Sequence, residues 1–358
     1  MRLAIQSPGA LTTVQDLGRW GFQAIGMPVG GAMDAPSLAR GNLLLGNPTG
    51  AAALEATASG PSVRFEGEGA VAVTGGDLAP RLNGASIPNW TVVLVKDGDL
   101  LTFGGMGGDG CRAYLCVAGG IDVPPLMGSR STYLRAGIGG FCGRRLAAGD
   151  VLPAGRPWGS WRLLAGVACP VELRPDRAPA PLRTILGPQD DRVAPEGVRT
   201  FFSAEYRVSG ASDRMGYRME GGAAIELTRG PDIVSDGVPM GAVQVPGTGL
   251  PIVMMADRQT TGGYVKIGVV HALDVARLSQ CPPGASVRFV RLSQEEGIEL
   301  AKREAAAQEA LRRHVDAAVR NAAGRAQGAG EAASGRLRVC VDGRDYSVAW
   351  ERFSRGGN

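Results

Sequence analysis

The feature that most constrains this fold is the frequent interruption of apolar runs by glycine and proline. The chain has 358 residues, of which 55 are Gly and 23 are Pro, and only 20% are charged. Between residues 62 and 152 the apolar runs are brief and are closed by Gly, Asp or Asn, as in VRF, AVAV, TVVLV, LLTF and AYLCVA. Such runs are typical of short strands joined by tight turns. The pattern predicts a mainly β protein built from sandwiches or barrels.

The length of the chain predicts two folded units and an extension, because compact domains usually contain roughly 100 to 200 residues. A Pro- and Arg-rich stretch, ELRPDRAPAPLR, lacks periodicity and cannot readily continue a central strand, so it is the best linker candidate. We therefore expect an N-terminal β domain at 1–170, a linker at 171–183, a C-terminal β domain at 184–292 and an extension at 293–358.

Residues 34–48 carry the signals of one short helix. Asp34 is a suitable N-cap, Pro36 falls in the first turn, and leucines follow at helical spacing before Gly-Asn-Pro. Gly and Pro after the last apolar residue are common where a helix stops.

The extension predicts a long helix followed by a hairpin. Residues 293–296, Ser-Gln-Glu-Glu, spell a capping box, and about 30 residues rich in Ala, Glu and Arg follow before a Gly-rich stretch at 324–330, where the helix should break. Acid and base pairs stand at the i,i+4 spacing that supports a helix: Glu299 with Arg303 and Glu309 with Arg313. The last segment, RLRVCVDGRDYSVAWE, predicts a hairpin that turns at 342–343.

Charge and composition argue against several classes of protein. The net charge is +4, and the arginines are scattered instead of forming a stripe, which disfavours nucleic-acid binding. No secretion signal and no apolar run of 18 residues is present, so we expect a cytoplasmic protein that does not bind membranes. The six cysteines form no C-x-x-C pair and are interpreted as reduced thiols.

The chemistry available is electrostatic and acid–base. No lysine follows a glycine, which excludes a P-loop, and no strand-GxGxxG-helix unit is present. The chain has two histidines, too few for a His-based metal site, and His271 in an apolar stretch is interpreted as a core residue with satisfied hydrogen bonds. Asp, Glu, Arg, Lys and Tyr remain as candidates.

The run from Ser235 to Tyr264 concentrates polar residues among glycines, and it is where the sequence places a functional surface. Two strand-like runs, AVQVP and PIVMM, separate Asp236 from the group at 257–261, so both polar clusters should lie at strand ends. Gly262-Gly263 would let backbone approach a ligand. The alternative is plain turn chemistry with a solvated charge pair.

A second polar region lies near the N-terminus, in TTVQDLGRWG at 12–21 and GGAMD at 30–34, and SDRMGYR at 212–218 has the same mixture. Gln15, Asp16 and Arg19 could instead form a solvent-facing turn with a local ion pair. Both interpretations stay open on the residues alone.

Taken together, the motifs resemble a carboxyltransferase-type family. It includes the C subunit of bacterial 5-oxoprolinase, allophanate hydrolase subunit 2 and the carboxyltransferase region of urea carboxylase. The resemblance covers roughly residues 3 to 292 and rests on TTVQDLGR, GAMD, NLLLGN, LEAT, GSRST, GPQDD, SDRMGYR, SDGVPMGAVQVP and DRQTTGGY. It implies two cyclophilin-like β-barrel domains with a site in the cleft between them.

The resemblance also implies a set of site residues. In catalytic roles it suggests Asp236, Asp257 and Arg258. In substrate binding it suggests Gln244, Gln259, Thr260, Thr261, Tyr264 and Lys266, together with Arg214, Gln15, Asp16, Arg19 and Asp34. No metal ligand is assigned among them.

By resemblance, the leading hypothesis is the C subunit of an ATP-dependent 5-oxoprolinase, a hydrolase that opens 5-oxo-L-proline to L-glutamate with A and B subunits. It would be inactive alone, with ATP and possible Mg²⁺ bound together with the partners.

A second hypothesis is a urea- or allophanate-type carboxyltransferase component that receives carboxybiotin from another chain, since no lysine here stands in the MKM context that biotin needs. A third is a regulatory partner of a B-like kinase inhibitor. Prolyl isomerisation rests on fold analogy alone.

Overall fold

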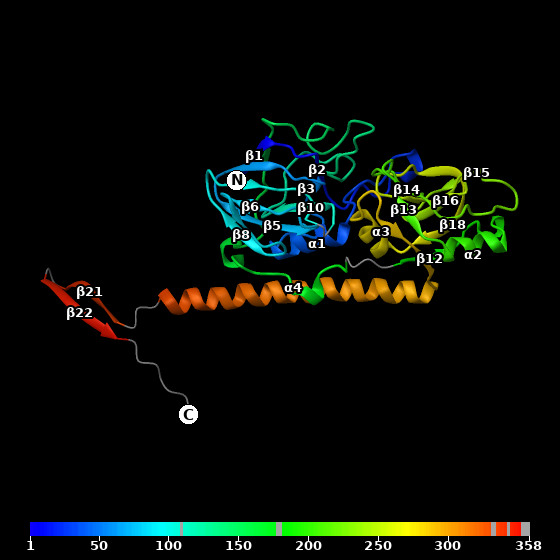
Figure 1. Ribbon diagram of the computed structural model, residues 1–358. Coiled ribbons are helices and arrows are strands. Elements are labelled where there is room, and N and C mark those ends of the chain that lie inside the picture. Colours follow the sequence, from blue (N-terminus) through cyan, green and yellow to red (C-terminus); the bar gives the residue numbers. More distant parts are fainter. Residues whose placement is uncertain (108–109, 177–180, 331–333, 342–343, 352–358) are drawn as a thin grey trace, which may run out of the picture.

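The computed structural model describes residues 1–107, 110–176, 181–330, 334–341 and 344–351. The protein is mainly β, as expected, and its sheets form two lobes that lie side by side above one long helix (Figure 1). We call the strands between residues 2 and 153 the N-lobe and those between 182 and 291 the C-lobe. Within the described residues, no helix combines the length and the apolar character needed to cross a membrane.

The N-lobe consists of two sheets that face each other across one core. The six-stranded sheet has the order β11 (Val151–Pro153), β1 (Arg2–Ser7), β4 (Ser62–Glu66), β9 (Leu100–Thr102), β6 (Arg81–Leu82) and β7 (Ala85–Ser86). The five-stranded sheet has the order β2 (Leu11–Gln15), β3 (Ala53–Thr57), β10 (Arg112–Val117), β5 (Gly69–Gly75) and β8 (Val92–Val95). Leu3, Phe65 and Leu115 are buried between them. The apolar runs of the sequence therefore become strands.

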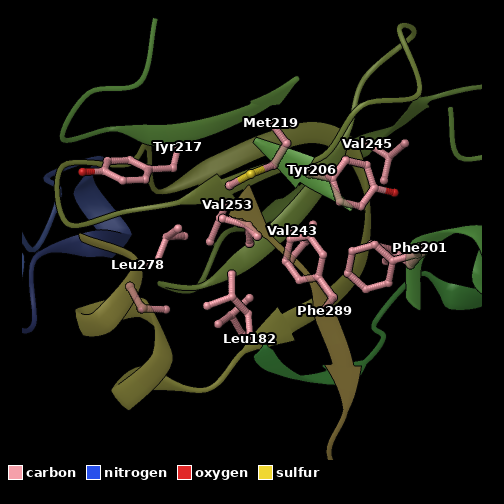
Figure 2. Close-up of a cluster of buried hydrophobic side chains, with 14 of the residues drawn as sticks. Leu182, Phe201, Tyr206, Tyr217, Met219, Val243, Val245, Val253, Leu278 and Phe289 are labelled. Carbon is pink, nitrogen blue, oxygen red and sulfur yellow. The ribbon is translucent and has the colours of Figure 1, made fainter. Parts of the chain in front are cut away.

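The C-lobe is a nearly closed barrel. Its strand order is β19 (Ser286–Val287), β13 (Tyr206–Val208), β14 (Gly216–Glu220), β17 (Ile252–Met254), β16 (Ala242–Val245), β18 (Thr261–Val270), β12 (Leu182–Leu186) and β20 (Phe289–Arg291), and β15 (Asp232–Gly237) pairs with β18. Only Arg288 separates the strands at the two ends of this order, so the chain itself closes the sheet. Figure 2 shows the core, where the rings of Phe201 and Phe289 stack at 4.4 Å.

The short helices cover the lobes. They are α1 (Ala35–Leu44), α2 (Pro195–Ser203) and α3 (Ala272–Ser279), with 3-10 turns η1 (Gln23–Ile25), η2 (Trp161–Leu164), η3 (Val171–Leu173) and η4 (Asp190–Arg192). The predicted helix at 34–48 is confirmed: the Asp34 carboxylate accepts a hydrogen bond from the Ser37 amide at 3.1 Å. His271 is half-buried and caps α3 instead of lying in the core, because its Nδ1 accepts from the Leu273 amide.

Helix α4 (Gln294–Gly330) runs beneath both lobes and joins them (Figure 1). The capping box is confirmed, since the backbone and side chains of Ser293 and Glu296 exchange hydrogen bonds of 2.8 and 3.1 Å. The helix continues through the stretch at 324–330 where a break was expected. The surface ion pairs also differ from the prediction, because they form three residues apart: Glu299 with Lys302 and Glu309 with Arg312.

The extension ends in a two-stranded hairpin, β21 (Ser334–Val341) and β22 (Arg344–Glu351), as the sequence predicts, and its expected turn at 342–343 lies outside the described residues. Part of the expected linker, 177–180, also lies outside them, and β12 already begins at Leu182. The domain boundaries themselves stay a prediction. The five cysteines whose side chains are described are all free thiols.

Candidate functional site

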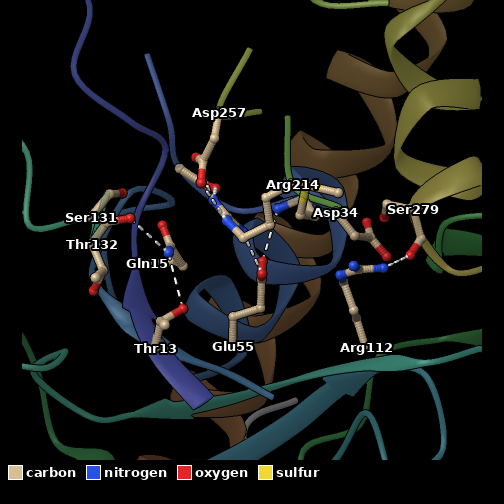
Figure 3. Close-up of polar contacts among 12 residues, drawn as sticks. Thr13, Gln15, Asp34, Glu55, Arg112, Ser131, Thr132, Arg214, Asp257 and Ser279 are labelled. Atoms are coloured by element: carbon tan, nitrogen blue, oxygen red, sulfur yellow. Dashed lines mark hydrogen bonds and ion pairs between the residues drawn. The ribbon is translucent and has the colours of Figure 1, made fainter. Parts of the chain in front are cut away.

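A buried ion-pair network joins the two lobes. Arg214 contacts both oxygens of Asp257 at 2.9 and 3.0 Å, Glu55 at 2.5 Å and the Gly31 carbonyl at 2.6 Å (Figure 3). Glu55 lies in β3 of the N-lobe, whereas Arg214 and Asp257 belong to the C-lobe. We call Glu55, Arg214 and Asp257 the interlobe triad. All three side chains are at least nine-tenths buried.

Strand pairing brings Arg214 and Asp257 of this triad together. Strands β14 and β17 run antiparallel with Gly216 opposite Met254, so Arg214, two residues before β14, comes close to the residues that follow β17. The Asp257 amide accordingly donates to the Arg214 carbonyl at 2.8 Å. This backbone hydrogen bond places the two side chains next to each other.

The charges of the triad stabilise one another in the buried site. Burial alone lowers the pKa of Arg214, but the charges of Asp257 and Glu55 outweigh it, and the net effect raises that pKa. The second Glu55 oxygen accepts from the Tyr114 hydroxyl and the Met33 amide, both at 2.8 Å. Burial in turn raises the pKa of the Tyr114 phenol. The two carboxylates are thus fixed in orientation beside a charged guanidinium.

A second contact between the lobes lies beside the triad. The Gln280 amide donates to Asp34 at 2.8 Å, and its oxygen accepts from the backbone amides of Cys111 and Arg112. Arg112 also donates to the Tyr217 hydroxyl at 2.6 Å. Asp34 is therefore both a helix cap and an interlobe contact.

The N-terminal polar residues are buried, which contradicts the interpretation as a solvent-facing turn. Asp16 accepts from the hydroxyls of Ser129 and Ser131 at 2.7 and 2.5 Å and from the Arg130 amide at 2.6 Å. Gln15 is fully buried and donates to the Thr132 carbonyl. These bonds fasten strand β2 to the segment that follows residue 128.

Arg19 leaves two of its side-chain hydrogen-bond donors without acceptors among the described residues. It is fully buried and donates from Nη2 to the Ser131 carbonyl at 2.5 Å, while Nε and Nη1 find no hydrogen-bond acceptor among the described residues. A Cβ added at Gly30 would lie 3.3 Å from Arg19 Nη1 and 3.6 Å from an oxygen of Asp257, so the two charges flank this glycine. Burial lowers the pKa of Arg19, against the raising effect of Asp16 and Asp257.

Arg258 is a buried cation without a carboxylate among the described residues. Its Nε donates to the Val238 carbonyl at 2.8 Å and its Nη1 to the Met255 carbonyl at 3.3 Å. Burial lowers the pKa of Arg258 to about 10. Because guanidinium groups pair well with carboxylates and phosphates, Arg258 is suited to an anionic ligand.

Other predicted residues lie around the β15–β18 pairing. Lys266 is fully buried, and its Nζ lies 3.3 Å from Asp236, a partly exposed residue that also accepts from Gln189 at 3.2 Å. The Gly237 amide and then Lys266 lower the pKa of Asp236. The Thr260 carbonyl accepts from Val238, and Thr261 begins β18. Gly262 and Gly263 lie within that strand and not in a loop.

The remaining predicted residues line a cavity of about 550 Å³, which we call the Gln244 pocket. Gln244, Gln259 and Tyr264 form one side of it, with a Gln259 to Gln244 amide contact of 3.5 Å. Arg135 reaches the same cavity from the N-lobe. The structure thus brings Arg19, Arg214 and Asp257 to the lobe boundary, whereas Asp16 is held by contacts within the N-lobe. It places Gln244, Gln259 and Tyr264 in the adjoining pocket and pairs Asp236 with Lys266 apart from the triad.

Sequence reasoning missed Glu55, Tyr114 and Arg135. Glu55 had a signal, since it is a single acidic residue within an apolar strand, and a buried carboxylate needs a partner. Tyr114 also interrupts an apolar strand. Arg135 had no such signal, because arginines in Gly-rich loops are common in this chain.

Together these findings define a two-lobed β protein with a buried, charged site at the lobe boundary, and the comparisons with known proteins identify its class. Residues 25–291 match the family described as carboxyltransferase domain, subdomain A and B. The chain belongs to this family, as its motifs suggested.

Two kinds of relative share the family. The chain is 40% identical to the 5-oxoprolinase C subunit of Escherichia coli K12, covering 83% of this chain and 93% of that protein. It is 36% identical to urea amidolyase of Lachancea kluyveri over 86% of this chain, but it spans 18% of that protein. Among solved structures, K. lactis urea amidolyase superimposes with a TM-score of 0.81 at 31% identity, over 87% of this chain and 20% of that one.

Proposed function

We propose that this chain is the C subunit of an ATP-dependent 5-oxoprolinase, which opens the lactam of 5-oxo-L-proline to L-glutamate together with A and B subunits. The observation that carries the proposal is the similarity to relatives named as 5-oxoprolinase C subunits. The chain is 40% identical to that of Escherichia coli and 35% identical to that of Haemophilus influenzae, and it covers 93% and 96% of them. The urea amidolyase relatives are each 36% identical.

The charged groups at the lobe boundary suit this chemistry. A lactam carbonyl is a poor electrophile, and phosphorylation of its oxygen by ATP would create a leaving group before water attacks. Arg258, which has no carboxylate partner among the described residues, would balance the charge of a phosphate or of the substrate carboxylate. Asp257, held by Arg214, would orient water or the ring N–H, and Asp236 is the second candidate.

ATP and any Mg²⁺ would be bound together with the partner subunits. This chain has no P-loop, so its contribution to nucleotide handling would come from cations such as Arg258 and Lys266, the second of which is paired with Asp236. When present, ATP supplies the phosphoryl group that activates the lactam. The hydrolase activity is thus proposed for the complex and not for this chain alone.

A carboxyltransferase component is the second candidate, favoured by the TM-score of 0.81 to K. lactis urea amidolyase. None of Lys96, Lys266 and Lys302 stands between methionines, so carboxybiotin would have to arrive on another polypeptide. A biotinylated companion chain would favour this candidate. A regulatory role would be favoured by tight binding of a B-like partner without turnover.

The deciding experiment measures ATP-dependent glutamate release from 5-oxo-L-proline by this chain alone and mixed with its candidate A and B subunits. We expect glutamate only in the complete mixture. A complete mixture that forms a complex but releases no glutamate would reject the proposal and favour the carboxyltransferase or regulatory alternatives.

A further inference from the structure

The Gln244 pocket is built by both lobes, although most of its wall belongs to the C-lobe. The cavity of about 550 Å³ has an apolar side that includes Met215, Ile252 and Met254. Its polar groups include Gln244, and its charged residues are Arg135, Arg218 and Asp213, whose Oδ1 already accepts from the Met215 and Gly216 amides. An apolar wall with a few polar groups is the usual composition of a small-molecule site.

Gln244 lines this cavity and carries an unused donor. The residue is 2% exposed, and its Nε2 has no hydrogen-bond acceptor among the described residues. The Gln259 amide donates toward Gln244 Oε1 at 3.5 Å, so the oxygen is the end already engaged. Gly262 leaves room for this arrangement, because a Cβ there would come within 2.6 Å of Gln244 Nε2. A buried N–H group without an acceptor is costly, so a ligand carbonyl would satisfy it.

Arg135 is carried to the pocket by a tight turn of the N-lobe. The backbone groups of Tyr133 and Ile138 exchange hydrogen bonds of 2.9 and 3.3 Å, which places Arg135 near the tip of the turn. The base of the turn is anchored where the Thr132 amide donates to the Val14 carbonyl at 2.9 Å. The Arg135 guanidinium contacts the Met215 sulfur on the C-lobe. Its exposed side chain remains able to pair with an anion at the mouth of the cavity.

We propose that the Gln244 pocket binds a small amide that carries a carboxylate, with Gln244 donating to the amide carbonyl and Arg135 pairing with the carboxylate. This inference rests on the proposed function and deepens it, because 5-oxo-L-proline has both groups on one ring. The ring methylenes would lie against Met254 and its apolar neighbours. Arg135 is then a specificity-determining residue supplied by the opposite lobe.

The test measures equilibrium binding to the isolated chain by ligand-observed NMR. The probes are 5-oxo-L-proline and 2-pyrrolidinone, which keeps the lactam but lacks the carboxylate. We expect Arg135→Gln to weaken binding of 5-oxo-L-proline by about 10- to 100-fold, the usual effect of losing one charged hydrogen bond, and to leave 2-pyrrolidinone unchanged. Gln244→Met should weaken both probes. Arg145→Gln, an exposed N-lobe arginine that does not line the pocket, is the matched control.

Two results would overturn the inference: unchanged binding of 5-oxo-L-proline by Arg135→Gln, or no binding of either probe by the unsubstituted chain. The outcome is separate from the test of the proposed function. If the complete mixture releases glutamate but Arg135→Gln leaves its KM unchanged, the pocket assignment falls and the proposed function stands. If the probes bind as expected without turnover in the mixture, the pocket assignment stands and the proposed function falls.

Discussion

Arg214 and Asp257 form a two-point ion pair because they lie at adjacent ends of paired strands, and Glu55 of the opposite lobe completes it. The register of β14 and β17 therefore builds the C-lobe part of the site, and docking of the lobes adds the rest. The contacts that hold the two lobes together here are also the contacts that form the candidate site. Residues at the lobe boundary should consequently affect stability as well as activity.

Removing Arg214 should destabilise the protein strongly. Arg214→Ala leaves Glu55 and Asp257 buried without their cation, and breaking a buried pair in this way typically costs about 3 to 5 kcal/mol. Urea denaturation measures the loss. The control is Arg199→Gln, which removes an exposed pair with Glu196 and should leave the midpoint nearly unchanged. Equal midpoints for both variants would contradict a structural role of the triad.

Arg258 should matter for activity more than for folding. Arg258→Ala removes a buried cation. All carboxylates keep their partners, because Arg258 contacts only backbone carbonyls among the described residues. We expect glutamate release by the complete complex to fall by at least about 100-fold, the scale for loss of one charge-stabilising donor. The variant should keep its cooperative unfolding transition. Normal turnover by a folded Arg258→Ala complex would rule out the proposed role.

Stability should depend on the protonation of His271. Burial lowers the pKa of His271, whose Nδ1 accepts from the Leu273 amide while Nε2 lies 3.2 Å from the Gly297 carbonyl of α4. The unfolded chain binds a proton near the ordinary pKa of 6.5, but the folded protein resists protonation to a lower pH. The free energy of unfolding should therefore fall as the pH drops below 6.5.

Urea denaturation at pH 7.5 and 5.5 tests this dependence, where both values are chosen to be about one unit from the ordinary pKa. His271→Asn keeps a capping side chain but cannot be protonated, so its two curves should differ less than those of the unsubstituted protein. An identical pH dependence in both proteins would show that other groups cause it.

Helix α4 should be held to the N-lobe by a few apolar residues. Leu311 is fully buried in an apolar cluster with Leu38 of α1 and Trp90, and Leu311→Ala should cost about 2 to 5 kcal/mol. Ile298→Ala, on the same helix with the side chain 48% exposed, is the control and should have a much smaller effect. Hydrogen exchange along α4 would localise the change. Similar losses for the two variants would contradict this docking.

Much of the fold could be predicted because its signals are local. The cap at Asp34, the capping box at 293–296 and the brief apolar runs each specify structure within a few residues, and all three predictions are confirmed. Predictions of side-chain partners were less successful. The acids of α4 pair with Lys302 and Arg312, because spacing on a helix permits three-residue and four-residue neighbours alike.

By itself, the sequence determined the mainly β class, the helix boundaries that carry caps, and membership of the carboxyltransferase family through its ordered motifs. Only the tertiary structure decided that Arg19 is buried, that Glu55 meets Arg214 and that Arg135 reaches the Gln244 pocket. The physical reason is separation along the chain. Local propensity acts over a few residues, whereas Glu55 and Arg214 are 159 residues apart and meet only when strand register and lobe docking are both complete.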